Sequence, residues 1–148
     1  MSDTTEESSL VGTARRLAAR HHAGQVDKAG APYIRHLERV AGRVSDLGVG
    51  HEAVAFLHDV LEDTDATEAD LLAAGLGEHI VEAVVALTKV RGESNADYYV
   101  RVRTNTLAWN VKLADVDDNA DPDRLAALDA PTRDRLTAKY HRARTALA

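Results

Sequence analysis

The sequence has no cysteine among its 148 residues. This absence excludes a disulfide framework, a zinc site built from thiolates and a cysteine nucleophile. It fits a reducing compartment, and we therefore expect a cytoplasmic location. The length corresponds to one ordinary domain, whose core can bury enough surface to fold without a structural metal.

Long apolar runs and a basic face are also missing. No stretch approaches the ~20 apolar residues that a membrane helix needs. The acidic, polar residues 1–9 lack the basic and apolar parts of a secretory signal. The formal net charge is −6, whereas a nucleic-acid binder usually carries a clustered basic face. We expect neither a membrane nor a nucleic acid as partner, although a few converging Lys and Arg side chains would still bind a phosphorylated small molecule.

Proline is rare and β-branched runs are short, which favours helix. Apolar residues recur at helical spacing along almost the whole chain, and no alternating strand pattern competes with them. We predict an all-α bundle of about seven to eight helices in one domain over residues 9–148, after a disordered lead over residues 1–8. The expected helices cover, approximately, residues 10–23, 33–47, 51–63, 67–74, 77–88, 94–102, 105–121 and 132–147.

The segment 58–63 combines one imidazole with three carboxylates. Glu62 follows His58 by four residues and Asp63 follows Asp59 by four, so a helix would place them on nearly the same face. Carboxylates this close repel one another and raise each other's pKa, which a bound divalent cation would relieve. Taken alone, the segment is equally well explained as exposed acids at a helix end beside a core histidine.

Two further segments extend this set. His36 lies near the start of the second expected helix, and Asp115 lies in an apolar stretch of the long helix, with Asn119 four residues later. Together with His58 and Asp59 they provide two imidazoles and two carboxylates, which leave positions for water on a six-coordinate metal. This mixture of nitrogen and oxygen ligands suits Mn²⁺ or Fe²⁺ better than a closed structural zinc site.

The sequence resembles the hydrolase domain of the RelA/SpoT family, a branch of the HD-domain superfamily. The matching segments occur in family order: HAGQ at 22–25, KAGAPYIRH at 28–36, LHDVLEDT at 57–64, LTK at 87–89, and VKLAD at 111–115 with Asn119. They span roughly residues 10–120. Because the chain is too short to include a synthetase domain, it is similar to the small hydrolase-only members, the small alarmone hydrolases and metazoan SpoT homologues.

The resemblance implies the fold of an HD-domain helical bundle and a specific chemistry. The implied cofactor is Mn²⁺, with Fe²⁺, Co²⁺ or Zn²⁺ as alternatives, held by His36, His58, Asp59 and Asp115. The implied catalytic residues, which act on the attacking water, are Glu62 and Asp63. The implied substrate is the alarmone ppGpp or pppGpp, cleaved at its 3′-pyrophosphate by metal-activated water.

Candidate substrate contacts surround this set; they are Lys28, Tyr33, Lys112, Asn119 and Arg101. The lysines are candidate phosphate contacts. The tyrosine would stack or hydrogen-bond at the pocket, and the asparagine would hydrogen-bond ribose or base. Arg101 and its neighbour Arg103 are weaker candidates, because arginines on a helix surface are usually only solvated.

The chain departs from the family pattern at three positions. Asp27 stands where the family typically has Arg, Leu37 where it has Pro, and Val116 where a basic residue often follows the aspartate. An anion at position 27 would repel a bisphosphate, so either the loop turns Asp27 away or the substrate is different.

Alternative functions therefore stay open. The first is an HD phosphohydrolase acting on another nucleotide, such as the 2′-phosphate of NADPH or a nucleoside monophosphate. The second is a nucleotide-binding sensor without catalysis, which Glu62 and Asp63 argue against because a sensor does not need to activate water. The sequence does not reveal the oligomeric state.

Overall fold

The computed structural model describes residues 2–148, with side chains from residue 10 onward. Helix α1 spans Ser2–His21, so its first turns include residues that the sequence assigns to a disordered lead. Met1 and the side chains of residues 2–9 lie outside the described part of the structure. The disordered lead over residues 1–8 therefore stays a prediction.

The fold is all-α, as predicted. After α1 come α2 (Tyr33–Val44), a 3₁₀ turn η1 (Ser45–Leu47), α3 (Val49–Leu57), α4 (Val60–Asp63), α5 (Glu68–Ala73), α6 (Glu78–Leu87), α7 (Asn95–Arg103), α8 (Thr106–Asn119), α9 (Pro122–Ala126) and α10 (Ala130–Leu147). Within residues 2–148 the only β pairing is an isolated bridge between Val26 and Pro32, and no strand is formed. No helix in this part of the chain is long and apolar enough to cross a membrane.

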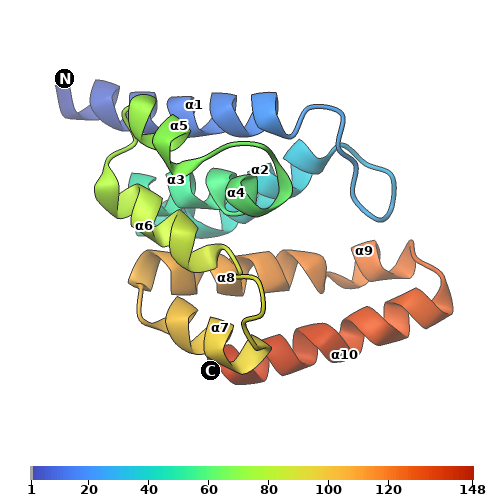
Figure 1. The fold of residues 1–148 in the computed structure, drawn as a ribbon. Helices are drawn as coiled ribbons and strands as arrows, with labels where there is room; N and C mark the ends of the chain where they lie inside the picture. The colour runs from blue at the N-terminus through green and yellow to red at the C-terminus, as the bar shows by residue number, and fades with distance from the viewer. Residues whose placement is uncertain (1) are drawn as a thin grey trace.

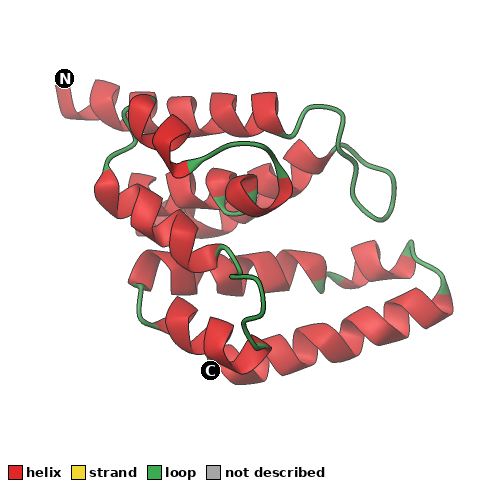
Figure 2. Cartoon of the chain, in the orientation of Figure 1, coloured by secondary structure: helices red, strands yellow, loops and turns green. Residues whose placement is uncertain are grey.

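Helix α3 lies at the centre of the bundle. It packs against α1, α2, α6 and α8, while α8 also carries α7 and α10 on its other side. Figure 1 shows the resulting order, with α1 and α10 on opposite sides of the molecule and α8 between them. The loop that joins α1 to α2 projects on the side where α9 meets α10 (Figure 2).

The apolar periodicity of the sequence explains this packing. Helix α2 buries one stripe that includes Leu37 and Val40, whereas the central α3 is buried on all sides over residues 53–57. Side chains cap the starts of α5, α7, α8, α9 and α10. Thr67 and Asp70 form a capping box at α5.

The structure differs from the expected helices at two places. The helix predicted over residues 51–63 is broken at His58 and Asp59, which separate α3 from α4. The His58 ring bonds the carbonyl oxygen of Ala55, which is the acceptor that a continuing helix offers to the amide of Asp59. The sequence also missed α9, whose Pro122 occupies the first turn and whose cap, Asp121, accepts from two amides.

Two neighbouring leucines on α5 provide a test of this packing. Leu71 is fully buried, whereas Leu72 is 46% exposed. We expect Leu71→Ala to lower the free energy of unfolding by about 2–5 kcal/mol, because it removes buried methyl groups and leaves a cavity. The matched control Leu72→Ala is expected to stay within about 0.5 kcal/mol. Urea denaturation measures both, and equal losses would show that α5 is packed differently.

Candidate active site

Three helices bring three buried ligand atoms together. His36 comes from α2, His58 from the C-cap of α3 and Asp115 from α8, and the three side chains could hold a metal ion. The Nε2 atoms of His36 and His58 lie 2.9 Å and 3.3 Å from Oδ1 of Asp115. Since these residues are far apart in sequence, the packing of α2, α3 and α8 creates the cluster.

Asp59, the fourth ligand that the sequence proposed, lies beside this cluster, and by distance it groups with Glu62 and Asp63. Its Oδ2 lies 3.1 Å from Nε2 of His58. Adjacent ligands of one ion, each bonded at 2.0–2.2 Å and at a right angle, are about 3 Å apart. The separations of 2.9 Å and 3.3 Å within the cluster therefore suit His36, His58 and Asp115 as ligands of one divalent cation, with Asp59 next to them.

The chemistry of His58 fits this interpretation. Its Nδ1 donates to the carbonyl oxygen of Ala55 over 2.7 Å, which leaves the lone pair on Nε2. That Nε2 atom is buried and has no hydrogen-bond partner among the described residues, although two carboxylates lie close to it. A buried nitrogen with an available lone pair beside carboxylate oxygens is a ready metal ligand.

His36 is oriented by Asp118, a residue that the sequence analysis missed. The Nδ1 of His36 bonds Oδ2 of Asp118 over 2.6 Å, so its Nε2 faces Asp115. Metal-binding histidines commonly donate their other nitrogen to a carboxylate in this way. Burial would raise the pKa of Asp118, but hydrogen bonds from His36 and Arg39 lower it to about 2. The sequence did offer a signal for Asp118. It follows Asp115 by three residues, so a helix places both aspartates on the same face of α8.

The site concentrates negative charge. Burial would raise the pKa of Asp115, but Lys112 and His58 hold it well below its usual range. Burial would lower the pKa of His58, but Asp59 and Asp115 raise it well above its usual range. Asp59 and Asp115 thus favour a positive charge at Nε2 of His58, which either a proton or, in its place, a divalent cation would supply.

Glu62 and Asp63 differ in their surroundings. The carboxylate of Glu62 accepts from the backbone amide of Lys89 over 2.9 Å, which ties α4 to the turn after α6. Asp63 lines the cavity beside the cluster. Burial, together with the charges of Asp59 and Glu62, raises the pKa of Asp63 to about 6.

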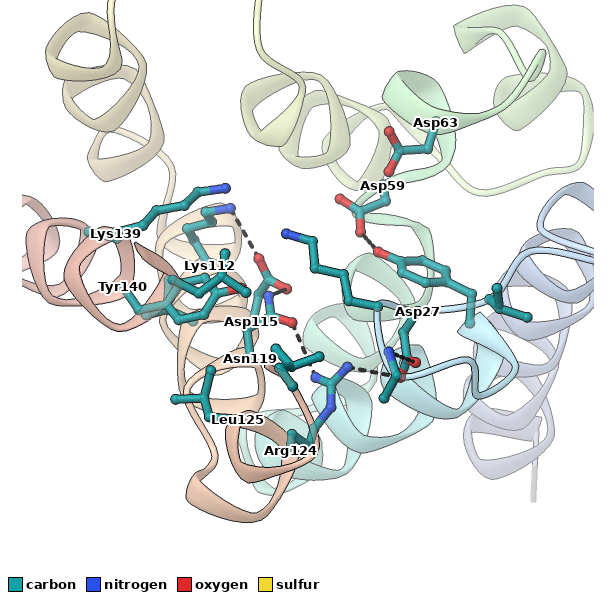
Figure 3. Close-up of a pocket in the computed structure, with 18 of the residues that line it drawn as sticks. Asp27, Asp59, Asp63, Lys112, Asp115, Asn119, Arg124, Leu125, Lys139 and Tyr140 are labelled. Carbon is teal, nitrogen blue, oxygen red and sulfur yellow. Dashed lines mark hydrogen bonds and ion pairs between the residues drawn. The ribbon is translucent and has the colours of Figure 1, made fainter. Parts of the chain in front are cut away.

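A cavity of about 520 Å³ opens beside the cluster, and this size is typical of a small-molecule site. Figure 3 shows Asp59 and Asp63 on one side of it and Lys139 and Tyr140 on the other, with Asp115 and Asn119 between them. The lining also includes four of the candidate substrate contacts: Lys28, Tyr33, Lys112 and Asn119. Asp115 positions two of these, since it accepts from Lys112 over 3.0 Å and from Asn119 over 3.1 Å.

Asp27 is neutralised within the protein. Its Oδ1 accepts from the amides of Ala29 and Ala31, and its Oδ2 pairs with Arg124 over 3.0 Å. The same guanidinium bonds Asp118 over 2.8 Å and Asn119 over 3.2 Å. Arg124 on α9, which the sequence analysis did not single out, thus links the loop to the carboxylate that orients His36.

The α1–α2 loop is held over the site by further bonds. The hydroxyl of Tyr33 donates to Oδ2 of Asp59. Gln25 donates to the carbonyl oxygen of Asp63 over 3.1 Å, and its own oxygen bonds Nδ1 of His22 over 2.8 Å. His22, to which the sequence gave no role, therefore orients a residue that joins the loop to α4.

Arg101 lies away from this cavity. Its guanidinium donates to the carbonyl oxygens of Val85, Ala86 and Thr88 and pairs with Glu93 over 2.8 Å. These bonds satisfy the carbonyl groups at the end of α6. Arg103 donates to the carbonyl oxygen of Ala146 over 3.3 Å. The structure thus uses both arginines to join helices.

Comparison with known proteins identifies the family. A family model described as an HD domain matches residues 14–116, which is more than half of the chain. The chain belongs to the HD-domain family. The matched segment of the HD domain contains all four proposed metal ligands, and it ends before Asp118, α9 and α10.

The similarity to RelA/SpoT-type proteins is confirmed. The chain is 35% identical over 92 residues to guanosine-3′,5′-bis(diphosphate) 3′-pyrophosphohydrolase of Aquifex aeolicus. It is 40% identical over 102 residues to a probable guanosine-3′,5′-bis(diphosphate) 3′-pyrophosphohydrolase of Synechocystis. These stretches cover 61% and 65% of this HD-domain chain but only 13% of each relative.

A solved structure confirms the fold. It is described as a metazoan orthologue of SpoT that hydrolyses ppGpp and plays a role in starvation responses, and it matches with a TM-score of 0.76. The match covers 93% of this chain and 85% of that one, at 23% sequence identity.

Two adjacent aspartates on α8 allow the role of Asp118 to be tested. We expect Asp118→Asn to weaken Mn²⁺ binding by roughly 10- to 100-fold, because His36 loses the charged acceptor that orients it. Asp117→Asn is the control, since that carboxylate is exposed and, among the side chains that the structure describes, pairs with Arg144 alone. Competition with a fluorescent chelator measures both affinities. Equal Mn²⁺ affinity in the two variants would contradict the role of Asp118.

Proposed function

We propose that the protein is a metal-dependent phosphohydrolase that cleaves the 3′-pyrophosphate of ppGpp or pppGpp, with Mn²⁺ as its metal. The observation that carries the proposal is the buried cluster of His36, His58 and Asp115, with Asp59 beside it, at the edge of a cavity lined by lysines. The names of its relatives support the same reaction.

The proposed ligands are His36, His58, Asp59 and Asp115. A divalent ion at such a site lowers the pKa of a bound water and polarises a phosphoryl oxygen. The protein contributes the geometry. The Ala55 carbonyl fixes the ring of His58, Asp118 fixes the ring of His36, and the hydroxyl of Tyr33 fixes the carboxylate of Asp59.

We assign the proton acceptor to Asp63. It lines the cavity, and burial, the largest cause of its raised pKa, favours proton uptake by its carboxylate. Glu62 stands beside it, fixed by the amide of Lys89, and adds the negative charge that raises this pKa. Glu62 thereby orients and tunes the site, while Asp63 takes the proton from the attacking water.

The surroundings of Asp27 support the alarmone over the alternative substrates. Asp27 would repel a bisphosphate if its carboxylate faced the ligand, but Arg124 and two amides satisfy it. Its side chain is only 8% exposed. The loop can therefore present Lys28 to a phosphate without a net negative charge beside it.

A substrate panel tests the proposal. Purified protein with Mn²⁺ is incubated with ppGpp, pppGpp, NADPH and nucleoside monophosphates, and the products are separated by ion-exchange chromatography. We expect ppGpp and pppGpp to release pyrophosphate. Preferential release of phosphate from NADPH or a monophosphate would assign the alternative function, and no turnover of any ester by metal-loaded protein would refute hydrolysis altogether.

Asp63→Asn tests the proton acceptor. We expect kcat to fall by roughly 10²- to 10⁴-fold, the usual contribution of a positioned base, with Mn²⁺ affinity retained. Asp65→Asn is the matched control, because Asp65 is exposed in the turn after α4. Glu62→Gln should also retain the metal and lose turnover. Full activity in either site variant would remove that residue from the mechanism.

A further inference from the structure

The cations that line the cavity divide into two groups. Lys112 pairs with Asp115, and Arg124 pairs with Asp27 and Asp118. These two are already neutralised by carboxylates of the protein, so they offer little free charge to a ligand.

Lys28 and Lys139 form the second group. Both line the cavity, and neither has a carboxylate within ion-pair distance among residues 10–148. Lys28 comes from the α1–α2 loop and Lys139 from α10, so two separate elements bring unpaired ammonium groups to one cavity. Burial lowers the pKa of Lys28, and the positive charges of Lys139 and Arg135 lower it further. Several cations therefore lie near one another at this end of the cavity.

The cavity is therefore polarised. Asp59 and Asp63 lie on one side and Lys139 lies across from them (Figure 3). The carboxylate side suits a metal and the phosphoryl group that it polarises. The lysine side suits a second anionic group of the same ligand, held away from the reacting one.

Resting on the proposed function, we infer that Lys28 and Lys139 form a second phosphate subsite, which binds the 5′-diphosphate of the substrate while its 3′-pyrophosphate is cleaved. The ligand class is a nucleotide with two phosphate groups on different sugar positions. Lys139 thereby acts as a specificity residue contributed by α10, which lies outside the matched HD-domain segment.

A series of substrates that differ only at the 5′ position tests the subsite. Guanosine 3′-diphosphates carrying a 5′-diphosphate, a 5′-monophosphate or a 5′-hydroxyl are compared. We expect Lys139→Gln to raise KM for the 5′-diphosphate about tenfold, the loss typical of one charged hydrogen bond. The penalty should shrink with each phosphate removed, and Lys139→Arg should restore most of the affinity.

The control is Arg142→Gln, an exposed cation on α10 that does not line the cavity. It should leave all three KM values unchanged. The subsite is refuted if Lys139→Gln raises KM equally for the three substrates, or if it raises none of them. Lys28→Gln should show the same dependence on the 5′ group.

A binding measurement separates this inference from the proposed reaction. Calorimetric titration of metal-free protein with GDP, which has 5′-phosphates and no 3′ group, needs no turnover. We expect Lys139→Gln to weaken GDP binding and Arg142→Gln to leave it unchanged. If wild-type protein hydrolyses no alarmone but this difference holds, the proposed function fails and the subsite stands. Equal GDP affinity in wild type and Lys139→Gln overturns the subsite.

Discussion

The buried carboxylate of Asp115 is the interaction on which the rest of the site depends. A charge in that position is costly unless it is paired, and Asp115 lies among polar side chains from three helices. Its Oδ1 faces the two histidines and Asn119, and its Oδ2 faces Lys112. The packing of α2, α3 and α8 thus supplies the partners that one buried charge needs, and Asp115 in turn positions Lys112 and Asn119 at the cavity.

The sequence predicted much of this arrangement, since helix periodicity and capping residues are local signals. The helices expected over residues 67–74 and 94–102 are both observed, and they begin at the caps Thr67 and Ser94. The proposed ligands were found from motifs and lie together in the structure. Periodicity could not reveal the break at His58, because a ring that bonds a backbone carbonyl leaves no mark on the apolar pattern. Periodicity also could not show which charged residues that are far apart in the sequence form ion pairs, such as Arg124 and Asp27.

That last pair shows how a family departure is accommodated. An aspartate in the loop looks unfavourable for a phosphate ligand when the loop is considered alone. In the folded chain, α9 supplies the opposite charge, and the carboxylate in addition organises the turn through Ala29 and Ala31. Asp27 therefore stabilises the loop through contacts within the protein.

Helix α10 forms the wall of the cavity that faces the carboxylates, yet it contributes no proposed metal ligand. Lys139, which would help to choose the ligand, thus occupies a separate stretch of the chain from the side chains that would do the chemistry. Mutations in α10 can therefore retune ligand preference while the reacting centre stays intact. Substitutions in the cavity-lining residues of this one helix would then be enough to give the same catalytic core a different substrate.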